Sequence, residues 1–157
     1  LDLSLQGIRL VYHLKGSPTV LGDVAFTDPR RHARMSGLGA IAARHSKPPI
    51  DAMIVVPCEY VVFGSFASHD VAEVNMDTLI SHLLKGTNLT SDDVVAVFQS
   101  HEATLFGAAV ERRTLSEARQ FVSRYGFKPI GYTTHPPRQI FPVCAVFNLP
   151  TPLKLSE

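Results

Sequence analysis

The residues of this chain with the widest choice of chemistry are seven histidines and two cysteines, because imidazole and thiolate groups bind metal ions and act as bases or nucleophiles. None of the histidines falls at the HxxxH or HExxH spacing of a zinc-binding helix, and none lies beside a cysteine in a ligand pattern. We therefore expect no metal site. The histidines are His13, His32, His45, His69, His82, His101 and His135.

Three other combinations of residue types could support catalysis. Cys58 with a distant histidine and an acid would make a nucleophilic site, but any domain with this many histidines permits that combination. Asp92 with Asp93, and Asp70 with Glu73, could form a general acid–base pair, but their positions favour loop and helix-cap roles. The sequence therefore predicts no catalytic residue and no cofactor-binding residue.

Phosphate-binding loops of two common kinds are absent from the sequence. No GxxxxGK[ST] motif is present, which excludes a P-loop GTPase or ATPase. The run Gly16-Ser17-Pro18 lies in a predicted hairpin turn and does not open a helix, so it cannot hold a phosphate as a dinucleotide-binding loop does. The absence of GxSxG also excludes the nucleophile elbow of an α/β-hydrolase.

Composition and length describe an ordinary soluble domain. The 157 residues suit one domain, and an apolar fraction of 45% argues against disorder. The net charge of +1 favours neither nucleic acid nor an acidic partner, and no apolar run approaches the roughly 18–20 residues of a membrane span. We interpret the chain, which starts at Leu1 inside a strand-like pattern, as a cytoplasmic fragment. Cys58 and Cys144 are interpreted as free, buried thiols, with a disulfide left open.

Apolar periodicity predicts a mixed sheet with helices, an α/β fold. Antiparallel strands are expected over 2–5, 8–14 and 20–26, and Asp51–Val56 is expected to be a central strand covered on both faces. Another strand is expected over 60–66 with a bulge at Gly64, and a hairpin over 94–110. A strand over 128–134 and an extended piece over 143–147 follow.

Three helices are predicted between these strands. The first begins at Asp28-Pro29 and turns Leu38, Ile41, Ala42 and His45 inward. The second begins near Val74-Asn75 and ends at Lys85-Gly86. The third begins with a capping box of Thr114 and Glu117 and ends at Gly126 in the left-handed conformation. Its inward stripe is Leu115, Ala118, Phe121, Val122 and Tyr125.

The first of these helices is basic, since it carries Arg30, Arg31, Arg34 and Arg44. A solvated charged face is the favoured interpretation, and a surface for anionic lipid, nucleic acid or an acidic partner is the alternative. Taken alone, three or four arginines offset by nearby acids make a weak case for such a surface.

The element order and several short motifs resemble the first actin-like domain of the PilM and GspL (EpsL) family of type IV pilus and type II secretion proteins. The similar segments are 2–11, Ile54-Val55-Val56-Pro57, 107–118 and 125–130. The segment 61–110 is similar to a β-α-β-β insertion that also marks the cell-division protein FtsA.

This resemblance implies half of an actin-like (ribonuclease H-like) ATPase fold. It divides the chain into a core subdomain of 1–60 and 111–137, an inserted subdomain of 61–110, and a docked tail and linker of 138–157. Asp2 matches the acid of the family's first phosphate loop, but Ser4 stands where the loop has glycine, and its Cβ would obstruct a phosphate. A polar residue at a strand start remains the simpler explanation of Asp2.

The resemblance favours a non-catalytic scaffold of an envelope-associated bacterial assembly, with other protein subunits as partners and self-association as one form of contact. The alternative is the first half of an actin-like ATPase that binds ATP together with a missing second half. Neither cofactor nor nucleic acid is expected for the scaffold, and no membrane span is expected in this fragment.

Overall fold

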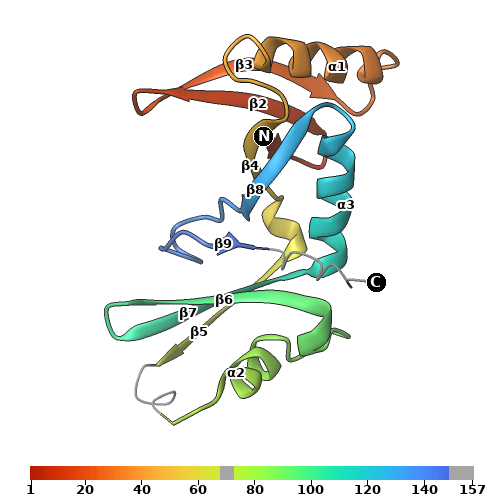
Figure 1. Ribbon diagram of the computed structural model, residues 1–157. Helices are drawn as coiled ribbons and strands as arrows, with labels where there is room; N and C mark the ends of the chain where they lie inside the picture. The colour runs from red at the N-terminus through yellow and green to blue at the C-terminus, as the bar shows by residue number, and fades with distance from the viewer. Residues whose placement is uncertain (68–72, 149–157) are drawn as a thin grey trace, which may run out of the picture.

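Two β-sheets make up the fold in the computed structural model, which describes residues 1–67 and 73–148 (Figure 1). The six-stranded sheet has the order β3-β2-β1-β4-β8-β9, and the three-stranded sheet has the order β5-β7-β6. The strands are β1 (Asp2–Leu3), β2 (Gly7–Leu14), β3 (Ser17–Ala25), β4 (Ile50–Val55), β5 (Val61–Ala67), β6 (Val94–His101), β7 (Thr104–Glu111), β8 (Phe127–Thr133) and β9 (Val146–Phe147). The helices are α1 (Arg31–Ala42), α2 (Met76–Leu83) and α3 (Arg112–Ser123), with short 3₁₀ turns η1 (Cys58–Tyr60) and η3 (Ser91–Asp93).

The six-stranded sheet is mixed, as predicted. Strands β1, β2 and β3 are antiparallel neighbours, whereas β1, β4 and β8 run parallel to one another. Strand β1 is two residues long and pairs with both halves: Asp2 lies opposite Arg9 of β2 on one side and opposite Val55 of β4 on the other. The parallel strands therefore direct their carboxyl ends to one edge of the sheet.

Both α1 and α3 cover the same face of this sheet, and the main core lies beneath them (Figure 1). Along β4, Ile50, Ala52 and Ile54 are buried, whereas Asp51 and Met53 are exposed. The prediction that this strand is covered on both faces is therefore wrong. The physical reason is that both helices pack on one side, so β4 is central in the hydrogen-bonded order but half-covered in the layers.

Helix α1 begins at Arg31, whereas the predicted first residue is Pro29, two positions earlier. Asp28 is not its cap: the Asp28 carboxylate accepts a hydrogen bond from the Arg30 amide (2.8 Å) and pairs with Arg34 (3.2 Å), which stabilises the preceding turn. The inward face differs in part from the prediction as well, because His45 is exposed and stacks near Tyr12 while Ile41 is half-buried. The buried residues are Met35, Leu38, Gly39 and Ala42.

Helix α3 has the predicted inward stripe but not the predicted start. It begins at Arg112, and Glu117 pairs with Arg113 (2.8 Å) one turn away, so the capping box of Thr114 and Glu117 is wrong. Leu115 and Val122 are fully buried, and the other members of the stripe pack against the core. Gly126 has φ +85°, which confirms the left-handed residue after the helix.

The three-stranded sheet carries α2 on one face (Figure 1). Asn75 caps this helix through its side chain, which accepts from the Thr78 amide at 2.9 Å. The predicted bulge at Gly64 is wrong, since the ladder of β5 and β7 pairs Gly64 with Gly107 without a register shift. A Cβ at Gly64 would lie 2.7 Å from Leu83, so the glycine instead makes room for α2 to approach the sheet.

The segment after β8 joins the two sheets. Phe141 is 2% exposed, and its ring lies 5.2 Å from that of Phe63 and 5.8 Å from that of Phe106, both in the three-stranded sheet. The segment then returns as β9, which pairs antiparallel with β8. The prediction of an extended piece over 143–147 is confirmed over Val146–Phe147, whereas the predicted linker from Leu149 lies outside the described residues.

The boundaries of an inserted subdomain at 61–110 stay a prediction. In the described part of the chain, no helix is both long and apolar enough to cross a membrane.

Replacing Phe141 with alanine tests the joint between the sheets. We expect Phe141→Ala to lower the free energy of unfolding by about 3–5 kcal/mol, because a fully buried aromatic ring leaves a cavity behind. The neighbouring Ile140 is 55% exposed, so Ile140→Ala is the matched control and should change stability by about 0.5 kcal/mol or less. Urea unfolding measures both, and equal effects would show that Phe141 does not hold the sheets together.

The turn η3 provides a pH-dependent contribution to stability. Asp93 accepts hydrogen bonds from the backbone N–H and from the side-chain hydroxyl of Thr90. Both lower the pKa of Asp93 below 3.8, and the backbone hydrogen bond lowers it more. The contribution is present above pH 3.8 and is lost as pH falls through the lowered pKa of the folded state. We expect the urea midpoint of Asp93→Asn to lie below wild type at neutral pH, with the difference narrowing under acid. A difference independent of pH would contradict this assignment.

Candidate functional site

The candidate site is the crevice at the carboxyl ends of the parallel strands β1, β4 and β8. Ligands of open α/β sheets commonly bind at such an edge, outside the carboxyl ends of the strands. Here Ser4 follows β1, Pro57 and Cys58 follow β4, and His135 follows β8. These residues line a crevice of about 400 Å³ together with Asp2, Gln6 and Glu59.

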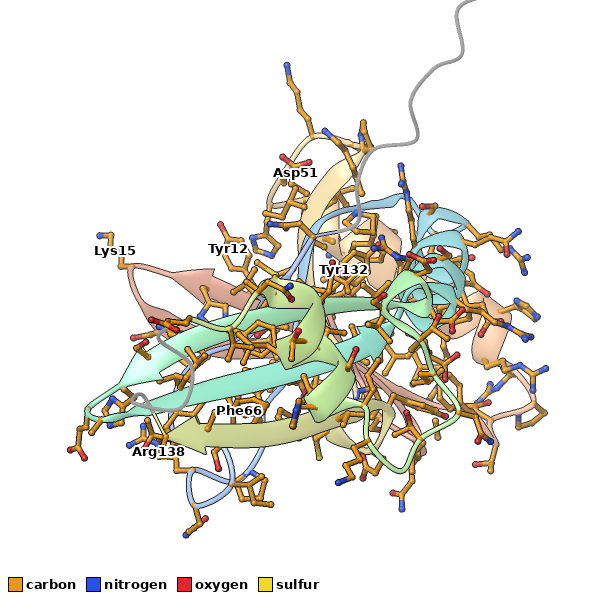
Figure 2. All side chains as sticks on the ribbon, turned by 90° about the horizontal axis from the view of Figure 1, so that it is seen from below. Tyr12, Lys15, Asp51, Phe66, Tyr132 and Arg138 are labelled. Atoms are coloured by element: carbon orange, nitrogen blue, oxygen red, sulfur yellow. The ribbon has the colours of Figure 1, made fainter. Side chains whose placement is uncertain are left out.

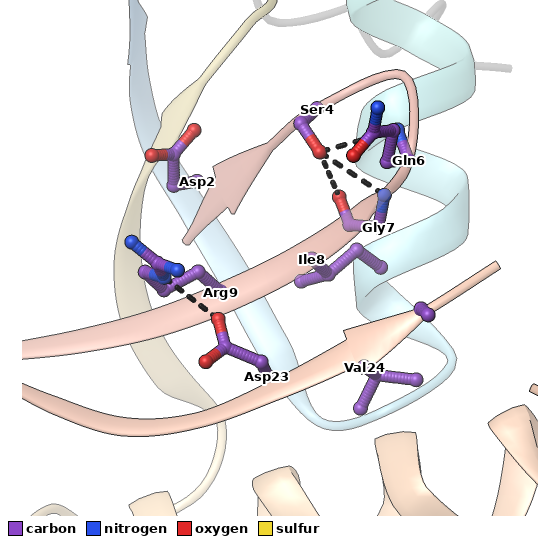
Figure 3. Close-up of a pocket in the computed structure, with 9 residues that line it drawn as sticks. Asp2, Ser4, Gln6, Gly7, Ile8, Arg9, Asp23 and Val24 are labelled. Carbon is purple, nitrogen blue, oxygen red and sulfur yellow. Dashed lines mark hydrogen bonds and ion pairs between the residues drawn. The ribbon is translucent and has the colours of Figure 1, made fainter.

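A second hollow, of about 370 Å³, lies against the β1–β2 turn and shares Asp2, Ser4 and Gln6 with the crevice (Figure 3). Asp2, Arg9 and Asp23 bring three charges to it, and Arg9 Nε contacts Asp23 Oδ1 at 2.7 Å. The hydrogen bond and charge of Asp23 raise the pKa of Arg9, and Asp2 raises it further by a smaller amount. Arg9 is therefore already neutralised by Asp23, and it is not a free cation for an incoming phosphate.

The β1–β2 turn is closed on itself by Ser4 (Figure 3). The backbone N–H groups of Gln6 and Gly7 both donate to Ser4 Oγ, at 3.2 and 3.0 Å, and Ser4 Oγ in turn donates to the Gly7 carbonyl oxygen at 3.0 Å. The Ser4 amide also donates to that carbonyl at 2.9 Å. Phosphate-binding turns need backbone N–H groups that point at the ligand. In this chain the serine hydroxyl already accepts hydrogen bonds from two of them, those of Gln6 and Gly7.

Gly7 holds the turn against the neighbouring strand. A Cβ at this position would lie 2.3 Å from the carbonyl oxygen of Val24 in β3, a distance that real structures do not tolerate. The glycine therefore serves the packing of β2 on β3, and not the close approach of a ligand.

The structure brings Cys58, Glu59 and His135 into the same crevice, which the sequence did not predict. Cys58 Sγ donates to Glu59 Oε2 at 3.7 Å. Among the described residues, however, no hydrogen bond joins Cys58 to a histidine, so the thiol lacks the adjacent base that a cysteine nucleophile uses. Asp2 lines the crevice as a lone carboxylate.

The other candidate residues are dispersed over the fold. His32 Nδ1 lies 2.7 Å from the hydroxyl of Tyr125, and His101 packs near Phe106. Asp92 and Asp93 lie in η3, far along the chain from the crevice, while His69 and Asp70 lie outside the described residues. Within the described ranges, histidine, cysteine and acidic side chains form no group of three that could hold a metal ion.

The two cysteines are free thiols, as predicted, but the prediction that both are buried is wrong. Cys58 is half-buried and Cys144 is exposed. Cys144 lies on the segment that connects β8 with β9, where its sulfur is 3.7 Å from the Thr133 hydroxyl. That segment crosses the surface between the sheets, so its side chains alternate between core and solvent.

A third hollow, of about 610 Å³, separates β2 from β4. It exists because β1 pairs with two residues of β2, after which β2 and β4 diverge. Leu1 lines it, and its nitrogen donates to the Met53 carbonyl oxygen at 2.8 Å.

Comparison with known proteins bears on the fold. No protein-family model matches the chain, and no curated protein matches its sequence. The fold is similar to the cytoplasmic domain of EpsL, an inner membrane component of the type II secretion system of Vibrio cholerae, with a TM-score of 0.59 at 15% sequence identity. The match covers 84% of this chain and 53% of that one, so the chain spans about half the length of this neighbour.

This likeness confirms the predicted fold class, an α/β fold with a mixed sheet, while its description as half of an actin-like fold stays a prediction. It supports the GspL (EpsL) part of the predicted resemblance. The likeness to PilM and the FtsA-like character of the insertion stay predictions.

Replacing Ser4 tests the closed turn. We expect Ser4→Ala to lower the free energy of unfolding by about 1 kcal/mol, because two backbone N–H groups lose their acceptor. Gln6→Ala is the matched control, since the Gln6 side chain makes no hydrogen bond to a described residue in the turn. Urea unfolding compares the two variants. An unchanged Ser4→Ala protein would mean that water satisfies the turn equally well, leaving its amides open to a phosphate.

Proposed function

We propose that this chain is a non-catalytic, protein-binding domain of a bacterial cytoplasmic scaffold in an envelope-associated assembly. The observation that carries the proposal is the turn between β1 and β2, whose amides are held by Ser4 Oγ at 3.0 and 3.2 Å. The amides of Gln6 and Gly7, at the position that the resemblance assigns to the first phosphate loop, are therefore already paired within the turn. The fold neighbour, a cytoplasmic domain of a secretion-system inner membrane component, supports the choice of this class of assembly.

The crevice supports the same conclusion. Its thiol is hydrogen-bonded to a carboxylate, and its aspartate has no ion pair to a described residue. Rate acceleration by an enzyme needs a nucleophile, acid or base held in reach of a partner group. The described residues of the crevice do not supply such a pair, so recognition is the better supported use of this domain.

The proposed contact surface for other subunits is the unit formed by β5, α2, β6 and β7. Val74 and Met76 at the start of α2 expose apolar surface, with Met76 55% exposed. Strand β5 is also an edge strand, paired with β7 on one side in the described sheet. Exposed apolar side chains and sheet edges are both common features of protein–protein contacts. Self-association through the same unit is a further form of the proposal.

The alternative function is the first half of an actin-like ATPase. Asp2 favours it, because its position in the crevice corresponds to the acid of the first phosphate loop in the resemblance described above. A second half, supplied by more of the polypeptide, would have to complete the nucleotide site.

Two measurements on the full-length protein separate these functions. In sedimentation velocity with the cytoplasmic subunits of the same assembly, we expect a complex that weakens at least tenfold in Val74→Asp/Met76→Asp. Ile140→Asp, which changes an exposed apolar residue elsewhere, is the matched control and should bind normally. In calorimetric titration with Mg-ATP we expect no binding tighter than about 1 mM. A strictly monomeric protein that binds no subunit would refute the scaffold, and tight ATP binding would establish the alternative.

A further inference from the structure

Charge is unevenly divided along this nearly neutral chain. Ten of the fifteen Lys and Arg residues, but only one of the fourteen acidic residues, lie in two segments, 30–47 and 112–128. These segments contain α1 and α3. These two segments, hereafter the basic layer, carry a formal charge of +9, and the remainder of the chain carries −8. A net charge of +1 therefore conceals a strongly dipolar molecule.

Helix α1 and the C-terminal end of α3 meet at Tyr125, which brings the two segments of the basic layer together there. A Cβ on Gly39 of α1 would lie 2.5 Å from the carbonyl oxygen of Tyr125, which follows α3. His32 Nδ1 of α1 lies 2.7 Å from the hydroxyl of the same tyrosine. Two segments about eighty residues apart in sequence thus present their cations on one side of the sheet, where nitrogen-tipped side chains project beside α3 (Figure 2).

Half of the ten cations in the basic layer are available for a partner. Arg34, Arg113 and Lys128 form ion pairs with acidic residues, and Arg112 and Arg31 donate to the carbonyl oxygens of Asp92 and Phe26. The five other cations are exposed and form no ion pair with a described residue. They are Arg30, Arg44, Lys47, Arg119 and Arg124.

The basic layer lacks the apolar anchors of a protein-binding surface. None of the large apolar side chains exposed among the described residues belongs to it. The centres of protein–protein interfaces are usually apolar and aromatic, with charges at the rim. A cationic surface without such a centre instead suits a dense anionic surface, to which binding is driven by charge.

We propose that the basic layer docks this domain on anionic phospholipid headgroups at a membrane surface. The choice of lipid over nucleic acid rests on the proposed function, which places the domain in an envelope-associated assembly. Each Lys or Arg near such a surface contributes about a fivefold increase in binding. The acidic remainder of the chain is repelled by the same surface, so the dipole fixes which side of the domain faces the lipid.

This orientation complements the proposed protein contacts. The unit of β5, α2, β6 and β7 carries Asp77 on α2 and lies at the other end of the molecule from α1 (Figure 1). It meets the basic layer where Arg112 donates to the carbonyl oxygen of Asp92. Docking through the α1 end of the basic layer would leave α2 facing away from the lipid and open to other subunits.

Co-sedimentation with vesicles tests the proposal, using phosphatidylglycerol mixed into phosphatidylcholine, and phosphatidylcholine alone as the reference. We expect Arg44→Gln/Arg119→Gln/Arg124→Gln to bind the anionic vesicles about 100-fold more weakly than wild type. The matched control, Lys15→Gln/Lys85→Gln/Arg138→Gln, removes the same number of exposed charges outside the basic layer and should bind within a few-fold of wild type. Circular dichroism checks that both variants fold.

Three results would overturn the proposal. Equal loss of vesicle binding in the two variants would mean that net charge alone drives the attraction, and wild-type binding to neutral vesicles as strong as to anionic ones would exclude charge altogether. Wild-type binding that does not weaken when the salt concentration rises from about 0.05 to about 0.3 M would exclude it as well. A short duplex DNA is the competing ligand. Tighter binding to DNA than to anionic vesicles, lost in the same arginine variant, would assign the surface to nucleic acid and also overturn it. Because subunit binding is measured separately, without lipid, failure here leaves the scaffold proposal standing.

Discussion

The two-residue strand β1 is the constraint on which the rest of the structure depends. It joins the antiparallel strands β2 and β3 to the parallel strands β4 and β8, with Asp2 opposite both Arg9 and Val55. Backbone hydrogen bonds from Val55 to the Leu1 carbonyl (2.7 Å) and from the Leu1 nitrogen to Met53 fix this strand on β4. Its carboxyl end sets the position of the turn at Ser4, and its short length leaves β2 and β4 apart beyond it. The crevice and the hollow between β2 and β4 are both consequences of this one strand.

A nucleotide site in this type of fold needs donors that remain unpaired until the ligand arrives, because a phosphate must replace water and not an internal partner. Here Ser4 supplies an internal partner to Gln6 and Gly7, and Asp23 supplies one to Arg9. The charged and polar groups around β1 are therefore stabilising contacts within the turn and across β2–β3. In the proposed scaffold, these groups hold the fold together and the outer surfaces are left for recognition.

The outer surfaces differ in chemistry because the two sheets are covered differently. The six-stranded sheet is covered on one face by α1 and α3, whose outward positions are rich in arginine. The three-stranded sheet is covered by α2, which docks through Leu83 into the space left by Gly64 and Gly107. Phe141 fixes the two units to each other by packing against rings from β5 and β7. Helices α1 and α2 thereby lie at opposite ends of one molecule (Figure 1).

The sequence by itself determined the elements and the fold class, because apolar periodicity, Gly126 after α3 and the side chain of Asn75 are local signals. It also indicated that Ser4 is unsuited to a phosphate loop, although it could not show that the hydroxyl holds the amides of the turn. The starts of α1 and α3 differ from the prediction because local ion pairs, of Asp28 with Arg34 and of Glu117 with Arg113, engage the expected capping residues. Only the tertiary structure decided that one face of β4 is open, that Cys58 meets His135 in one crevice, and that α1 meets the end of α3 at Tyr125. Contacts between residues far apart in the chain set these features, and no local pattern encodes them.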